Sequence, residues 1–146
     1  LVQSRQQLMT AIVQAIVGAM RRDPKRPDAE VGLKTPSIHS DLLWTLHSNN
    51  NIAEALRRFG VSRTTRTLIL VRVAPPLDAG ELVQHMTQLV DGTLQTRGLS
   101  LPSPALAWSE LGTAYKIQDT PAFQHPDTSQ VDALICSMVA SKYVGA

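Results

Sequence analysis

The sequence predicts an α/β fold of the mixed α+β kind, in which several helices flank a small central sheet within a single domain spanning residues 1–146. Three observations support this prediction. Residues 41–73 read as a strand, a helix and a second strand, and helical periodicity recurs near both ends of the chain. At 146 residues the chain is long enough to bury one hydrophobic core but too short for two.

The first predicted helix covers residues 3–22. Its apolar positions form a row with a spacing of four and a second row beside it: Leu8, Ile12, Ile16, Met20, Met9, Val13 and Val17. A stripe this broad is typical of a buried helix. Pro24 stops the helix, and the polar residues 21–36, with three prolines and no periodicity, predict a loop.

The central unit opens with a predicted strand over residues 41–47 (Asp-Leu-Leu-Trp-Thr-Leu-His) and closes with another over residues 67–73 (Thr-Leu-Ile-Leu-Val-Arg-Val). Both runs are short and apolar. The residues between them predict a polar turn followed by a short helix over residues 52–59. This order predicts a β-α-β unit, in which the helix lies on the sheet.

Both ends of the short helix carry boundary signals. Asn51 is expected to accept from the first helical amides while Glu54, three residues on, reaches back, which is the capping-box arrangement. Gly60 is expected to end the helix in a left-handed conformation. The apolar positions that share one face are Ile52, Leu56 and Phe59.

A third helix is predicted over residues 78–90, after a pair of prolines that ends the second strand. Asp78 and Glu81 have capping-box spacing at its start, and Asp-Gly follows its end. Its apolar face is made by Leu82, Val83, Met86, Leu89 and Val90.

The last third of the chain predicts two more helices. Residues 103–111 begin with Ser-Pro and predict a brief helix, residues 115–117 an extended segment and residues 118–126 a loop. The final helix starts near Thr128 or Ser129. Its amphipathic stripe is Val131, Leu134, Ile135, Met138 and Val139.

Three stretches of this chain resemble a known family. They are Asn-Asn-Asn-Ile-Ala-Glu-Ala-Leu-Arg-Arg-Phe-Gly-Val-Ser (residues 49–62) with the strand that follows, Tyr-Lys-Ile (residues 115–117) and Val-Asp-Ala-Leu-Ile-Cys-Ser-Met (residues 131–138). In sequence and in order they resemble the TPRKB family, the small subunit of the KEOPS/EKC complex that binds its atypical kinase, PRPK. Family members open with further strands and a helix, so we expect this domain to be partial at its N-terminus and to lack those strands.

The resemblance implies a function that the residue patterns alone do not. It implies a non-catalytic subunit that binds the PRPK-type kinase alongside other KEOPS/EKC subunits and helps to hold tRNA. The chain would thereby support threonylcarbamoyl adenosine (t6A) modification of tRNA. The family further implies residence in nucleus and cytoplasm and a link to telomere maintenance.

Composition narrows the classes of partner. The formal net charge of +2 hides an uneven distribution, because residues 1–72 hold 11 basic and 5 acidic side chains whereas residues 73–146 hold 3 and 7. No apolar run is long enough to predict a membrane span. The single cysteine fits a reducing compartment, and the four histidines lack metal-ligand spacing. We therefore expect no metal site, no cofactor and no small-molecule substrate.

A cluster of basic residues follows the predicted turn of the central unit. Arg57, Arg58, Arg63, Arg66 and Arg72 lie within sixteen residues, and no acidic residue separates them. The pattern leaves open whether they bind phosphates or form a solvated surface. The family resemblance favours tRNA binding, for which the candidates are Arg57, Arg58, Arg63 and Arg66.

The stripe of the last helix also has two interpretations. Val131, Leu134, Ile135 and Met138 could pack on the sheet as core, or dock into a groove of a partner. The pattern favours core, whereas the resemblance favours a helix that is apolar on two sides, with one face free for the kinase. We therefore take these four residues as the candidate kinase-binding site.

Two alternative functions remain open from the sequence. The basic cluster also fits a stand-alone RNA-binding protein. A small enzyme is the other alternative, in which His47 at the end of the first predicted strand, or Cys136 on the last helix, would act. A lone histidine at a strand end and a lone cysteine beside an apolar stripe are more often structural.

Overall fold

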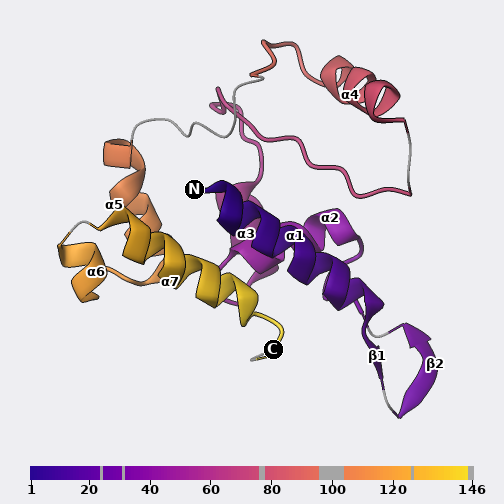
Figure 1. Cartoon of the computed structure of the whole chain (residues 1–146), viewed down its shortest axis with the longest axis horizontal. Helices are drawn as coiled ribbons and strands as arrows, with labels where there is room; N and C mark the ends of the chain where they lie inside the picture. The colour runs from indigo at the N-terminus through magenta and orange to yellow at the C-terminus, as the bar shows by residue number, and fades with distance from the viewer. Residues whose placement is uncertain (24, 31, 76–77, 96–103, 126, 145–146) are drawn as a thin grey trace.

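The computed structural model describes residues 1–23, 25–30, 32–75, 78–95, 104–125 and 127–144. Within these residues the chain forms seven helices and one two-stranded hairpin (Figure 1). In chain order the elements are α1 (Arg5–Met20), β1 (Arg22–Asp23), β2 (Arg26–Glu30), α2 (Ile38–Leu46), α3 (Ile52–Phe59), α4 (Ala79–Gln88), α5 (Pro104–Tyr115), α6 (Pro121–Gln124) and α7 (Thr128–Ala140). None of the described helices combines the length and apolarity needed to cross a membrane.

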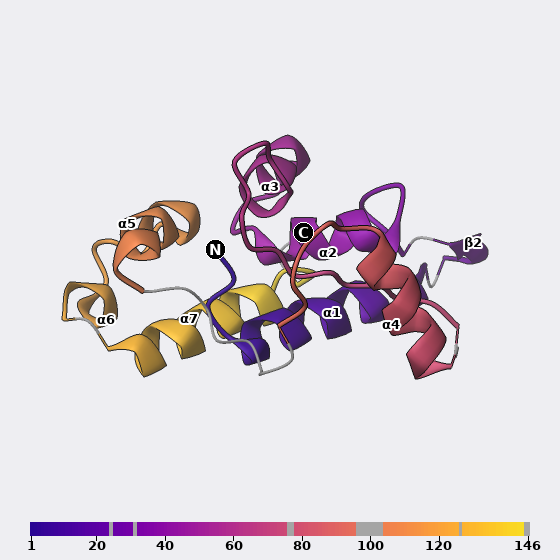
Figure 2. The same cartoon turned by 90° about the horizontal axis from the view of Figure 1, so that it is seen from above.

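Helix α1 is the centre of the arrangement, since it packs against both α2 and α7, and α2 packs in turn against α3. Figure 2 shows α3, α2 and α1 stacked in that order. Helices α5 and α6 lie at the N-terminal end of α7. The ring of Trp108 on α5 stacks on the ring of Phe123 on α6, with 4.9 Å between the ring centres. Helix α4 stands away from this assembly and buries none of its residues.

The predicted central sheet is wrong. The strands in the described residues are β1 and β2, which pair antiparallel in a hairpin inside the predicted loop 21–36. Residues 41–47, the first predicted strand, lie mostly in helix α2. A short apolar run does not distinguish a strand from a buried helix, and here the residue that caps the N-terminus shows that the run is helical. The Ser40 backbone N–H donates to the Ser37 side chain at 3.2 Å, which starts the helix.

The second predicted strand is also absent. Residues 67–73 form no strand, and no backbone hydrogen bond joins residues 66–72 to another described residue. The physical reason is that a strand needs a neighbour with free backbone groups. Its predicted neighbour is helical, so this segment has the composition of a strand but no pairing partner among the residues that the structure describes.

The helices predicted at residues 3–22, 52–59, 78–90 and 128 onward are confirmed as α1, α3, α4 and α7, while other predictions need correction. Residues 115–117 are not extended, because Tyr115 ends α5 and Lys116 turns with a φ of 54°. The predicted loop 118–126 contains α6. The brief helix predicted from residue 103 continues to Tyr115, while Ser103 itself lies outside the described residues.

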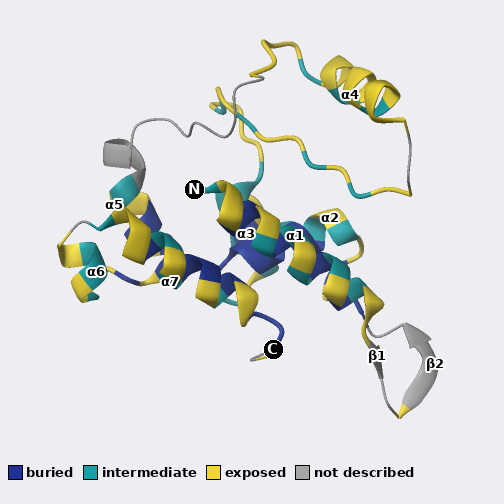
Figure 3. Cartoon of the chain, viewed as in Figure 1, coloured by how far each residue is buried: buried dark blue, intermediate teal, exposed yellow. Residues whose placement is uncertain are grey.

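The core lies where α1, α2, α5 and α7 meet (Figure 3). Its buried apolar residues are Ala11, Ala15, Leu42, Leu46, Leu111, Ala114, Tyr115, Ile117, Val131, Ile135 and Val139. The Tyr115 hydroxyl accepts from the Gln7 side chain at 2.6 Å and donates to the Leu46 carbonyl. This one hydroxyl therefore ties together α1, α2 and α5, and its burial raises the pKa of Tyr115.

Candidate functional site

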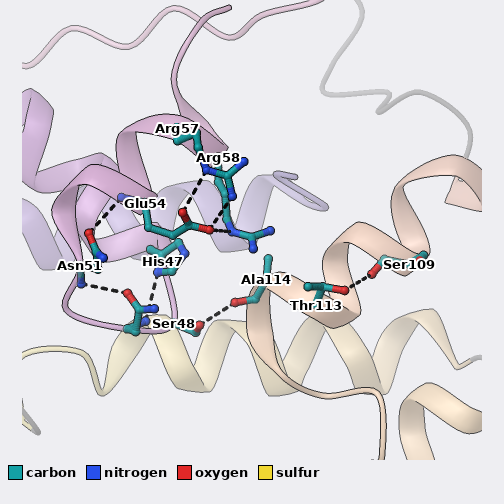
Figure 4. Close-up of polar contacts among 10 residues, drawn as sticks. His47, Ser48, Asn51, Glu54, Arg57, Arg58, Ser109, Thr113 and Ala114 are labelled. Atoms are coloured by element: carbon teal, nitrogen blue, oxygen red, sulfur yellow. Dashed lines mark hydrogen bonds and ion pairs between the residues drawn. The ribbon is translucent and has the colours of Figure 1, made fainter.

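Helix α3 carries a compact group of charged side chains (Figure 4). Asn51 caps the helix as predicted, with its side chain accepting from the Glu54 N–H at 3.1 Å. Glu54 does not complete the capping box. Its carboxylate instead accepts from Arg57 Nη2 at 2.6 Å and from Arg58 Nε at 2.5 Å. The bonds from Arg57 and then Arg58 lower the pKa of Glu54 to about 2.

Gly60 ends α3, but not in the predicted left-handed conformation, since its φ is −78°. Its N–H donates to the Leu56 carbonyl at 2.9 Å. A Cβ at this position would lie 2.3 Å from that same oxygen. Glycine is therefore required for close backbone approach rather than for a positive φ.

The four arginines predicted to bind tRNA fall into two pairs. Arg57 and Arg58 share the carboxylate of Glu54, which balances part of their charge. Arg63 and Arg66 lie on the segment after α3, where both are exposed. Exposed arginines outside an ion pair are better placed to meet phosphates. The assignment of all four to tRNA stays a prediction.

The four residues predicted to bind the kinase share one face of α7, and that face is turned inward. Val131 is 2% exposed and Ile135 is 0% exposed, both within the core. Leu134 and Met138 are half-buried and pack against the same core. Kinase contact by these residues stays a prediction, but two of the four, Val131 and Ile135, are already buried in the core.

A second apolar surface lies on α1 and was missed from the sequence, where the whole stripe was assigned to the core. Met9, Val13, Val17 and Met20 are 46%, 50%, 46% and 74% exposed, and their spacing places them on one side of the helix. The opposite side faces the core through Leu8, Ala11 and Ala15. One feature of the sequence could have indicated this second surface. Residues 6–20 carry no charged side chain, so the helix lacks the charged face that usually points to solvent.

His47, one of the two candidate catalytic residues, is enclosed at the C-terminal end of α2. It is 3% exposed, and its Nδ1 accepts from the Asn49 N–H at 3.1 Å. Its Nε2 is buried without a partner among the described residues. Burial lowers the pKa of His47. A histidine enclosed away from solvent is poorly placed to exchange protons with a substrate.

Lys142 closes this end of α2. Its Nζ donates to the carbonyls of His47 at 2.7 Å and of Asn49 at 2.5 Å, and lies 4.5 Å from the centre of the Trp44 ring. Burial lowers the pKa of Lys142 to about 8. The carbonyl groups and the ring stabilise the cation. Lys142 thereby links the segment that follows α7 to the turn between α2 and α3.

Cys136, the other candidate, is buried on α7 with its Sγ 3.9 Å from an Asp132 carboxylate oxygen. Burial, with the negative charge of Asp132, raises the pKa of the Cys136 thiol. The thiolate is thus disfavoured. In the part of the chain that the structure describes, no group of three or more His, Cys, Asp and Glu residues is arranged to hold a metal ion.

Comparison with known proteins identifies the family. A family model described as "Kinase binding protein CGI-121" matches residues 1–143. The chain belongs to this family. The resemblance to the kinase-binding subunit of KEOPS/EKC, based on the three stretches above, is thereby confirmed. No solved structure was found to match this member of the CGI-121 family.

Several fungal relatives of this CGI-121 family member are named as EKC/KEOPS complex subunits. It is 34% identical over 96 residues to the Gibberella zeae subunit, covering 61% of this chain and 44% of that protein. It is 31% identical over 113 residues to the Cryptococcus neoformans subunit, covering 76% and 48%. It is 24% identical over 130 residues to the Neurospora crassa subunit, covering 74% and 63%. The chain thus spans about half the length of these curated relatives.

Proposed function

We propose that this chain is a non-catalytic subunit that binds the kinase of an EKC/KEOPS complex and so supports t6A modification of tRNA. The observation that carries the proposal is the match of residues 1–143 to a family described as kinase binding. The relatives named as EKC/KEOPS subunits add the complex in which that binding would take place. The chemistry of the modification would then belong to other subunits.

The burial of the two candidate catalytic residues supports a binding role. His47 and Cys136 are 3% and 7% exposed, so neither side chain is open to a substrate, and burial raises the pKa of the Cys136 thiol, which disfavours the reactive thiolate. The exposed stripe of α1, by contrast, is the kind of contiguous apolar surface that mediates contact with another protein. Enclosed candidate catalytic residues and an exposed apolar helix face together favour a protein that binds a partner.

The tRNA part of the proposal depends on the basic residues after α3. Arg63 and Arg66 are exposed, and Arg72 follows on the same segment. They would neutralise phosphates without reading sequence, as a subunit that only holds tRNA requires. Residence in nucleus and cytoplasm, and a role in telomere maintenance, belong to the same proposal and rest on the family resemblance.

Co-purification with the PRPK-type kinase of the same organism tests the proposal. We expect a stable complex, and we expect a reconstituted complex to make less t6A when this chain is omitted. The absence of both effects would overturn the proposal. A salt titration of tRNA binding by the chain alone distinguishes this proposal from the alternative of a stand-alone RNA-binding protein. A stand-alone binder would retain tRNA tightly without the kinase, whereas a subunit of the complex would bind tRNA only weakly alone.

A further inference from the structure

The turn that follows α3 carries three hydroxyl side chains in contact with one another. They belong to Ser62, Thr64 and Thr65, within residues 61–66, which form no helix or strand. The Ser62 and Thr64 hydroxyl oxygens are 3.0 Å apart, and the Thr64 N–H donates to Ser62 Oγ at 3.3 Å. The Ser62 N–H donates in turn to Thr65 Oγ1 at 2.9 Å. These side-chain contacts, rather than a regular backbone ladder, hold the turn in shape.

Ser62 is accessible from solvent. Ser62 and Thr64 are exposed, whereas Thr65 is half-buried and its hydroxyl oxygen is engaged by the Ser62 N–H. Thr65 also lines an apolar hollow together with Leu1 and Val2, and neither Ser62 nor Thr64 contributes to that lining. Ser62 therefore lies outside the surface that the first residues of the chain help to form.

The surroundings of Ser62 are basic. Residues 55–77 contain five arginines and no acidic residue. Arg63 directly follows Ser62, and Arg66 lies four residues after it. Both are exposed, and neither forms an ion pair with a residue that the structure describes. Their positive charge is thus available to a protein or a nucleic acid that approaches the turn.

The backbone around Ser62 is open to an enzyme that needs an extended peptide. Serine/threonine kinases bind the residues around the acceptor hydroxyl in an extended conformation, so a serine inside a helix has to be unwound first. Helix α3 ends at Phe59, and residues 61–73 form no helix or strand. Opening the turn breaks the hydroxyl contacts and one backbone hydrogen bond, from the Thr65 N–H to the Ser62 carbonyl at 3.2 Å. The basic neighbours fit a kinase with an acidic substrate groove.

We propose that Ser62 is a phosphorylation site for a serine/threonine kinase with an acidic substrate groove, and that its phosphate weakens tRNA binding by the adjoining arginines. The regulatory part of this inference rests on the proposed function, which assigns tRNA to those arginines. In the reaction the γ-phosphoryl group of MgATP passes to Ser62 Oγ. The bond between the γ-phosphorus and the β,γ-bridging oxygen breaks, a P–Oγ bond forms, ADP leaves, and the hydroxyl proton goes to the catalytic aspartate of the kinase.

The charge of the phosphate explains its expected effect on tRNA. Phosphoserine carries a charge of about −1.5 to −2 at neutral pH. The segment after α3 carries three arginines, Arg63, Arg66 and Arg72. The Thr64 N–H already donates to Ser62 Oγ, so a hydrogen-bond donor lies beside the oxygen that would carry the phosphate. A phosphate held there cancels more than half of the segment's positive charge, and tRNA phosphates lose about one to two cationic partners.

Mass spectrometry tests the modification itself, on the protein purified from the cells of its own organism with phosphatase inhibitors present. Trypsin cleaves after Arg58 and Arg63, and Ser62 is the only hydroxyl residue of the peptide 59–63. Where the phosphate blocks cleavage after Arg63, fragmentation of residues 59–66 distinguishes Ser62 from the two threonines. We expect phosphate on Ser62. Its absence overturns the inference and leaves the proposed function standing.

Phosphoserine encoded at position 62 tests the regulatory part. We expect the complex of this chain with the PRPK-type kinase to bind tRNA about tenfold more weakly at about 150 mM salt than the unmodified complex does, with the salt slope reduced by about one to two. Phosphoserine at position 109 is the matched control, since Ser109 is exposed on α5 and residues 98–115 contain no basic side chain. We expect this control to bind tRNA as the unmodified complex does.

The remaining outcomes decide between the inference and the proposed function. Equal tRNA binding by the complexes modified at positions 62 and 109 overturns the regulatory part. So does a fall in the unfolding temperature of the chain modified at position 62 with loss of kinase binding, because the phosphate would then act on the fold. Failure of the unmodified complex to bind tRNA overturns the tRNA part of the proposed function, and the regulatory part with it.

Discussion

Replacing Ile135 by alanine tests whether the inner face of α7 is core or a free binding surface. The Ile135 side chain is 0% exposed, and Ile135→Ala removes three buried carbons. At about 0.8 kcal/mol per methylene, the lost transfer free energy is about 2.4 kcal/mol. The cavity that remains adds to this, so the free energy of unfolding should fall by about 3–4 kcal/mol. This is a large fraction of the stability of an ordinary domain.

Urea unfolding followed by circular dichroism measures this change. Val83→Ala is the control, since Val83 also carries a branched side chain on a helix but is 51% exposed. Its effect should stay within about 0.5 kcal/mol. If the two variants lose the same small amount of stability, α7 is not packed on the core. Its four predicted kinase-binding residues would then be available to a partner.

Three further predictions concern charge and packing. The folded state lowers the pKa of Glu54 from 4.5 to about 2, so the ionised carboxylate stabilises the fold above pH 4.5, and this stabilisation is lost as the pH falls towards 2. Glu54→Gln should therefore flatten the dependence of the unfolding temperature on pH between these values. An unchanged profile would contradict the ion pairs. Arg63→Glu should weaken tRNA binding and reduce its salt slope by about one or more, measured by filter binding at several salt concentrations; an unchanged slope would make Arg63 ordinary surface. Gly18→Ala would place a Cβ 2.3 Å from the Tyr143 hydroxyl oxygen and should destabilise the fold by about 1–3 kcal/mol in thermal melts; an unaltered melting temperature would show that the tyrosine moves away freely.

Elements with local boundary signals could be predicted from the sequence. Helix α3 begins at its Asn51 cap, and α4 begins at Asp78, whose side chain accepts from the N–H groups of Gly80 and Glu81. These signals act within one helical turn, so they need no knowledge of the rest of the fold. Helix α2 was missed because the prediction began at residue 41 and overlooked the capping serine at position 37.

The candidate sites depend on tertiary contacts that a sequence pattern does not contain. The basic cluster was predicted without an intervening acid, yet Glu54 lies one helical turn before Arg57 and Arg58 and engages both. The rule that residues three and four apart meet on a helix could have found this pairing. The exposed side of α1 is different. An uncharged helix shows that two apolar sides exist, but only the packing of α2 and α7 decides which one stays open.

The unpaired segment shows the limit of strand prediction most directly. Residues 67–71 have the composition of a strand, and their composition was read correctly. Strand formation, however, is a property of two segments, because the stabilising hydrogen bonds and cross-strand contacts belong to the pair. A helix can be predicted from one stretch since its hydrogen bonds are internal. A strand-like composition without a pairing partner among the described residues therefore shows a propensity and not an element.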